Sequence, residues 1–249
     1  MIKRKNAPHV FHIGTSGWSY EHWKETFYPE TLKSTEWLNY YSENFSTVEV
    51  NTTFYHTPRQ KTTVNWHDQV PKDFLFSIKI NRYISHIKRL NDCSDSLEIF
   101  YKSIRNLKTK IGPILVQLPP SFKINEERLQ EFIGSLDKKF QYTFEFRHES
   151  WFIDSIYKLL NEHNVALCIT DLNGIQSPEE ITADFTYIRL HGPHKAYIGS
   201  YGPKRLKIWK DKIENWIPSC TVYCYFDNDE KNYAIKDAKF LENLMIEKN

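Results

Sequence analysis

The candidate chemistry of this chain rests on two glutamates that lie inside short, strand-like runs. Glu49 lies between two valines and Glu145 lies between two phenylalanines. Residues that alternate with period two face opposite sides of a β-strand, so each glutamate faces away from its apolar neighbours. Two carboxylates that meet can act as general acid and base when their surroundings separate their pKa values. The alternative is a pair of structural ion pairs, because buried charges are usually paired.

Three cations are expected on the same inner strand faces as these glutamates, namely Lys79, Arg147 and Arg189. Arginine offers a planar fork and lysine a point charge to a phosphate or carboxylate group. Three cations against two carboxylates leave one spare positive charge, which Asp229 would cancel if it turned inward. We expect an anion between Lys79 and Arg189, near the turn at 14–17, whose backbone N–H groups suit an anion. Structural neutralisation of the glutamates is the alternative.

Further candidates follow the strand-like runs or lie in loops. His191 comes directly before a glycine and is the histidine best placed for proton transfer near neutral pH. Tyr197 and Tyr201 bracket a glycine, a pattern typical of a mobile lid. The remaining expected substrate contacts are Ser16, Trp18, Asn51, Gln117 and Asn228. The histidines are scattered without metal-ligand spacing, so we expect no metal and no other cofactor, with a zinc or manganese site as the minor alternative.

The elements that must position these residues alternate between two periods. Strand-like runs that end in polar residues lie at 12–17, 47–51, 77–81, 115–119, 143–147, 167–171, 187–191 and 225–229. Helical periodicity fills the gaps at 35–45, 60–69, 95–110, 125–137, 152–163, 205–217 and 232–246. The connection 172–184 is short and contains Pro178, so we expect only a turn there. This alternation predicts parallel strands in a single-domain (β/α)8 TIM-type barrel over 1–249, with a doubly wound open sheet as the alternative.

Length and composition agree with one folded domain. The chain has 249 residues, of which 40% are hydrophobic, and a formal net charge of +2. That charge is too small to predict a nucleic-acid partner by itself. The four cysteines form no Cys-x-x-Cys pair, and no apolar run has the length of a signal peptide or a membrane span. We therefore expect a cytoplasmic protein without membrane contact.

Taken together, the motifs resemble the YecE-like family, known as domain of unknown function 72. The resemblance rests on 13–20, 23, 27–29, 45–51, 54–55, 76–79, 85–86, 118–122, 145–151, 187–192, 197–201 and 226–229, in order along nearly the whole chain. It implies a TIM barrel and says little about activity, because the family's biochemical role is unsettled. Two departures are small: Ser85 replaces a usual threonine, and Asp227 replaces a common asparagine and adds a negative charge to the rim.

These observations favour an enzyme, hydrolase or lyase, that binds a small anionic substrate at the barrel mouth and uses Glu49 and Glu145 for proton transfer. One alternative is a nucleic-acid-binding or metal-dependent phosphodiesterase-like protein, suggested by the basic and aromatic loop at 194–205. Another is a barrel that binds a ligand without turnover. The near-neutral charge predicts at most weak nucleic-acid contact, and the oligomeric state stays open.

Overall fold

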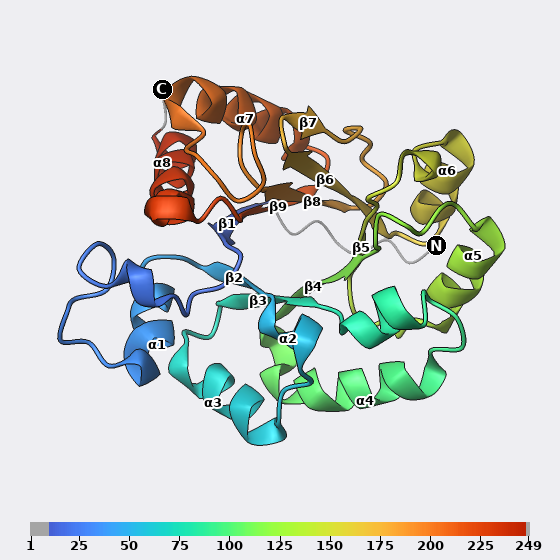
Figure 1. Ribbon diagram of the computed structural model, residues 1–249, viewed down its shortest axis with the longest axis horizontal. Helices are drawn as coiled ribbons and strands as arrows, with labels where there is room; N and C mark the ends of the chain where they lie inside the picture. Colours follow the sequence, from blue (N-terminus) through green and yellow to red (C-terminus); the bar gives the residue numbers. More distant parts are fainter. Residues whose placement is uncertain (1–9, 248–249) are drawn as a thin grey trace.

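The computed structural model describes residues 10–247 and shows parallel strands arranged in a ring (Figure 1). The ring contains β1 (Phe11–Thr15), β2 (Thr47–Val50), β3 (Leu75–Lys79), β4 (Ile111–Gln117), β5 (Tyr142–Glu145), β6 (Ala166–Leu172), β8 (Phe185–Leu190) and β9 (Thr221–Phe226). Their order is β1-β9-β8-β6-β5-β4-β3-β2, and β1 and β2 meet to close the ring. The predicted TIM-type barrel is confirmed, and the open sheet is excluded.

Helices cover the outside of this ring. They are α1 (Trp37–Ser42), α2 (Thr52–Tyr55), α3 (Gln60–Gln69), α4 (Ser94–Ile104), α5 (Glu126–Ser135), α6 (Asp154–Glu162), α7 (Gly202–Trp216) and α8 (Tyr233–Ile246). Asn125 caps α5 as its type suggests, since its side chain accepts a hydrogen bond from the backbone N–H of Arg128. Between β6 and β8 there is no helix but the short β7 (Ile175–Gln176), which pairs antiparallel with β6.

Shorter helical turns complete the connections. They are the 3-10 turns at Glu21–Trp23, Ser34–Glu36, Arg105–Lys110, Glu149–Trp151 and Glu230–Asn232, and a π-helical turn at Tyr83–Ile87. Within residues 10–247, no helix has the length and apolar character needed to cross a membrane.

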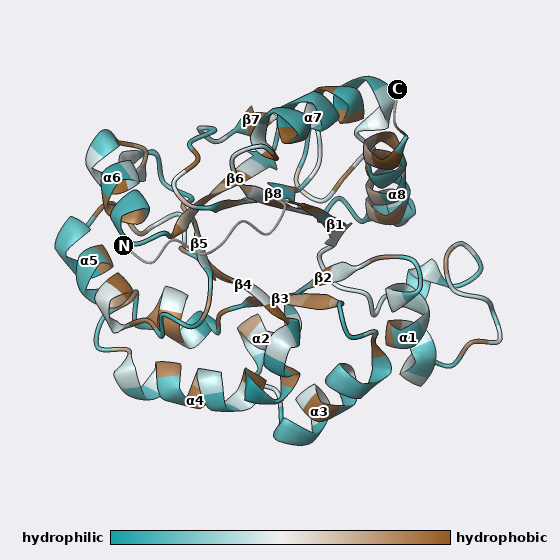
Figure 2. Ribbon diagram, turned by 180° about the vertical axis from the view of Figure 1, so that it is seen from behind, coloured by the Kyte–Doolittle hydropathy of each residue, from teal (hydrophilic) through white to brown (hydrophobic). Residues whose placement is uncertain are grey.

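Two separate apolar layers explain the alternation of the strands. The larger layer lies between strands and helices and contains both valines of β2, and Phe144 and Phe146 around β5. The smaller layer fills the barrel interior and contains Leu115, Ala166, Cys168, Phe185, Tyr187, Tyr223 and Tyr225. Figure 2 shows the matching pattern on the helices, where hydrophilic residues dominate the surface away from the strands. The polar residues on the same inner faces lie beyond this interior layer, at the C-terminal ends of the strands. We call this end of the barrel the mouth.

Barrel closure depends on Gly14. A Cβ atom at this position would lie 2.3 Å from the carbonyl oxygen of Thr47, so only glycine lets β1 approach β2 this closely. The segment 14–17 carries β1 past its last residue, Thr15, and two of its N–H groups are used by the protein. The Ser16 N–H donates to the Phe226 carbonyl at 2.9 Å, and the Gly17 N–H donates to the Thr15 carbonyl at 3.1 Å. These two N–H groups are not available to an anion, which corrects our expectation.

Candidate functional site

A buried ion pair between Glu49 and Arg189 lies at the centre of the mouth. The guanidinium is bidentate, with Nε to Oε2 at 2.9 Å and Nη2 to Oε1 at 2.7 Å. The hydroxyls of Ser16 and Tyr187 donate to the same carboxylate at 2.6 and 2.7 Å. Glu49 on β2 and Arg189 on β8 are not on neighbouring strands, so the pair spans the barrel interior. Arg189 is 1% exposed and Glu49 is fully buried. The buried pair is stabilised because each carboxylate oxygen of Glu49 accepts two hydrogen bonds.

Glu145 extends this network from β5. Its Oε2 accepts from Nη1 of Arg189 at 2.7 Å, and its Oε1 accepts from Gln117 at 2.9 Å and from Nε of Arg147. Burial acts to raise the pKa of Glu145, but the charges of Arg147 and Arg189 lower it well below its usual value. Glu145 is therefore an ionised acceptor that holds both guanidinium groups in place.

Asp227 completes the network, in the role that Asp229 would have had if it turned inward. Its Oδ2 accepts from Nη2 of Arg189 at 3.2 Å and lies 2.9 Å from Nδ1 of His191. Asp229 instead accepts a hydrogen bond from the indole of Trp23 at 2.8 Å. Asp227 thus supplies the third carboxylate against three cations, which cancels the spare positive charge that we counted from the sequence.

His191 is neutral in this arrangement. Burial, followed by the charge of Arg189, lowers the pKa of His191. Its Nε2 lies 3.2 Å from both Nη2 of Arg147 and Nη1 of Arg189, which are obligatory donors, so Nε2 is an acceptor and Nδ1 carries the proton that Asp227 accepts. All five N–H groups of Arg189 are consequently engaged by protein acceptors, which leaves none for the substrate anion that we expected it to hold.

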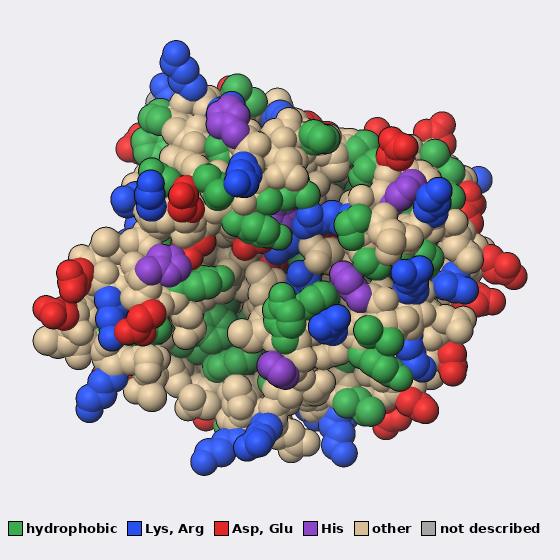
Figure 3. All heavy atoms as spheres, in the orientation of Figure 1, with side chains coloured by type: hydrophobic (Ala, Val, Ile, Leu, Met, Phe, Trp, Pro, Cys, Tyr) green, Lys and Arg blue, Asp and Glu red, His purple; other side chains and the backbone are tan. Residues whose placement is uncertain are grey.

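Lys79 and Arg147 are the cations that remain available. Nζ of Lys79 lies 4.3 Å from the ring centroid of Phe54, and no carboxylate of residues 10–247 forms a salt bridge with it. Burial, followed by the charge of Arg189, lowers the pKa of Lys79 to about 8. Arg147 uses Nε and Nη2 within the network, while its Nη1 has no hydrogen-bond partner in the described part of the chain. Figure 3 shows charged side chains and a histidine inside a hollow near the centre of this face.

Of three further predicted contacts, Tyr197 lies where a lid residue would, whereas Tyr201 and Asn228 act differently. Tyr197 is 51% exposed and its ring lies edge-on to His191 at 5.7 Å, where it covers that histidine as a lid residue would. Tyr201 is buried, and its hydroxyl accepts from the Gly192 N–H at 3.0 Å, so the predicted lid does not include it. Asn228 is fully buried, and its Nδ2 donates to Gly199 and Asp237, which ties the loop before α7 to α8.

Trp18 and Asn51 line a separate pocket beside the mouth. The indole of Trp18 lies edge-on to that of Trp66 on α3, with ring centroids 5.3 Å apart. Together with Tyr20 and the start of α2, these residues enclose about 360 Å³. No pattern in the sequence indicates Trp66 as a site residue, because α3 is distant from Trp18 along the chain.

Two network residues escaped the sequence analysis although the strand period identifies them. Tyr187 shares the face of Arg189 on β8, and Asp227 continues the phase of Tyr225 beyond the end of β9. Neither residue is among the expected site residues, and Asp227 enters there only as a rim charge. Extending the period-two phase one residue past each strand would have found Asp227.

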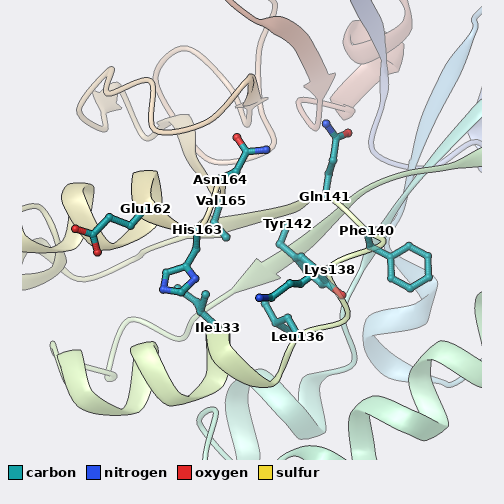
Figure 4. Close-up of a pocket in the computed structure, with 10 residues that line it drawn as sticks. All are labelled: Ile133, Leu136, Lys138, Phe140, Gln141, Tyr142, Glu162, His163, Asn164 and Val165. Atoms are coloured by element: carbon teal, nitrogen blue, oxygen red, sulfur yellow. The ribbon is translucent and has the colours of Figure 1, made fainter. Parts of the chain in front are cut away.

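A further pocket lies at the opposite end of the strands (Figure 4). It encloses about 280 Å³ between the segments that enter β5 and β6, and its lining includes Gln141, Tyr142, Asn164 and Val165. Barrel enzymes gather their catalytic groups at the other end, so this pocket belongs to the side that usually serves stability. In the described residues, no group of three or more His, Cys, Asp or Glu side chains is placed to hold a metal ion.

Comparisons with known proteins agree with this architecture. The model of the family described as "Protein of unknown function DUF72" matches residues 12–249. The chain is 26% identical to UPF0759 protein YecE of Escherichia coli, over 87% of this chain and 85% of that protein, and 24% identical to YunF of Bacillus subtilis, over 96% of each. A crystal structure of a DUF72 family protein from Thermotoga maritima superposes with a TM-score of 0.86 at 28% identity, over 96% of this chain and 100% of that chain. The chain belongs to the DUF72 family.

Proposed function

We propose that this barrel is an enzyme that binds a small anionic substrate, bearing a phosphate or carboxylate group, through Lys79 and Arg147 at its mouth. The observation that carries the proposal is that both cations keep N–H donors without a partner among residues 10–247, whereas Arg189 has none left. A largely buried ammonium group without a carboxylate partner is costly, and an anionic ligand would remove that cost.

The lowered pKa of Lys79 supports this residue as the group that moves a proton. A lysine whose pKa is about 8 is partly deprotonated near neutral pH and can accept a proton from a bound substrate. The acid and base roles that we expected for Glu49 and Glu145 fit less well, because every oxygen of both carboxylates already accepts a hydrogen bond. In this proposal Glu145 and His191 are positioning residues that hold Arg147.

Thermal melting in inorganic phosphate and in oxalate tests the proposal. A ligand at 100 times its Kd stabilises the folded protein by about 2.7 kcal/mol, so one of these anions should raise the Tm of the wild-type protein. Lys79→Met and Arg147→Met should each remove that response. Lys72→Met is the matched control, because it removes an equal charge from an exposed position just before β3, at the other end of that strand. A wild-type Tm that neither anion changes, or an equal loss in Lys72→Met, would contradict a specific site.

A further inference from the structure

The pocket beside the mouth has a composition unlike the rest of the protein. Its walls come from the segment after β1, the turn before α1 and α1 itself, the segment after β2, and α3. The lining residues are Gly17, Trp18, Ser19, Tyr20, Ser34, Thr35, Leu38, Asn51, Thr52, Asn65, Trp66 and Gln69. None of its twelve lining residues is charged, although 26% of the chain is. Its volume of about 360 Å³ lies within the range of small-molecule sites, about 300–1,000 Å³. A charged group would find no counter-charge there, so the pocket suits a neutral ligand.

The lining combines aromatic faces with hydrogen-bonding groups. Trp18, Tyr20 and Trp66 supply the rings, and the indoles of Trp18 and Trp66 are perpendicular to each other. Asn65 and Gln69 add side-chain amides from α3. Aromatic rings that surround a few amides and hydroxyls recognise cyclic ligands by stacking while the polar groups fix their orientation.

Asn51 brings to the pocket lining an acceptor that no protein group within residues 10–247 uses. Its Oδ1 is buried and has no hydrogen-bond partner within residues 10–247. Asn51 occupies the N-cap position of α2, where an asparagine oxygen normally accepts from the first turn of the helix, yet its side chain makes no such bond. Leaving a buried acceptor unpaired is costly, so the residue is not explained by stabilisation of the helix.

A single short segment joins the pocket to the mouth. Asn51 and Thr52 line the pocket, the hydroxyl of Thr53 donates to the Lys79 carbonyl at 2.6 Å, and the Phe54 ring lies 4.3 Å from Nζ of Lys79. On the other side of the pocket, the hydroxyl of Tyr20 donates to the backbone carbonyl of Ser16, and the hydroxyl of Ser16 donates to Glu49. The segment 51–54 therefore contacts both the pocket and Lys79.

We infer that the pocket binds a neutral ring with N–H or O–H donors, a sugar or a nucleobase, and that this ring and the anion held by Lys79 and Arg147 belong to one molecule. The second part rests on the proposed function. The substrate class is then a sugar phosphate or a nucleotide.

Calorimetric titration with three sets of probes tests this inference. The first set is inorganic phosphate, the second is glucose and adenosine, and the third is glucose 6-phosphate, ribose 5-phosphate and AMP. We expect at least one linked probe to bind the wild-type protein about tenfold or more tightly than phosphate does. Asn51→Leu should remove most of that gain, leave phosphate affinity unchanged and leave the protein at least as stable, because the unpaired acceptor is gone. Asn161→Leu, at an exposed position on α6, is the control that should change nothing.

The outcomes separate this inference from the proposed function. A gain for the sugar phosphates alone assigns the pocket to a sugar, and a gain for AMP alone assigns it to a nucleobase. If no linked probe binds more tightly than phosphate, or if Asn51→Leu keeps the full gain, the inference is wrong while the anion site stands. If phosphate and the linked probes fail to bind but glucose or adenosine binds and Asn51→Leu loses it, the pocket stands while the proposed function and the idea of one shared ligand fail.

Discussion

Replacing Lys79 by methionine should stabilise the protein at neutral pH, although Lys79 is the central residue of the proposed site. Lys79 is 9% exposed, and its pKa falls from 10.5 to about 8 because burial disfavours the charged amine. At about 1.4 kcal/mol per pKa unit, keeping this lysine charged costs roughly 3 kcal/mol of folding stability, as an upper limit. For a chain of this size that corresponds to a rise in Tm of about 6–12 °C.

The gain should depend on pH in a defined direction. Below pH 8 the lysine is charged in both the folded and the unfolded state, so its full cost is present. As the pH rises through 8 the folded protein releases the proton while the unfolded chain still binds it, and the cost shrinks until it vanishes above 10.5. Urea denaturation of wild type and Lys79→Met should therefore differ most at pH 7 and converge toward pH 10.5.

Lys110 provides the matched control. It is similarly buried, at 6% exposed, but its Nζ donates to the carbonyls of His67 and Val70 at 2.6 and 2.8 Å at the end of α3. Lys110→Met should therefore destabilise the protein, since each hydrogen bond to a charged group contributes about 1.5–3 kcal/mol. If Lys79→Met is destabilising as well, Lys79 has a stabilising partner and the reasoning behind the anion site fails.

Two substitutions and one binding assay test the network, the closure of the barrel and the nucleic-acid alternative. Glu49→Gln should lower the free energy of unfolding in urea by about 3–5 kcal/mol, because it leaves Arg189 buried with one carboxylate fewer; a loss below 1 kcal/mol would show that the pair is dispensable. Gly14→Ala should impair folding or lower Tm strongly, since its methyl group would overlap the Thr47 carbonyl, whereas an unchanged Tm would mean that β1 and β2 separate freely. Fluorescence anisotropy should find at most weak binding of duplex DNA at physiological salt, and submicromolar affinity with a steep salt dependence, near 0.9 per phosphate contact, would favour the nucleic-acid alternative.

The roles within the mouth were harder to predict than its members. Period-two alternation placed Glu49, Glu145, Arg147 and Arg189 on the inner face, and the structure brings all four into one network. Alternation did not reveal which cation would stay free. Arg189 contacts the carboxylates of Glu49, Glu145 and Asp227, so all of its N–H donors are used. Arg147 lies just past the end of β5, and its Nη1 has no hydrogen-bond partner in the described part of the chain.

The sequence by itself determined the order of strands and helices, the barrel, the inner phase of the charged residues and the missing helix at 172–184, because these follow from local periodicity and chain length. Only the tertiary structure decided that Asp227 and not Asp229 enters the network, that Tyr201 is buried, and that Trp66 meets Trp18 across a pocket. These outcomes depend on strand stagger and on the path of loops between distant segments. Such contacts are fixed by closure of the whole ring, and no local pattern encodes them.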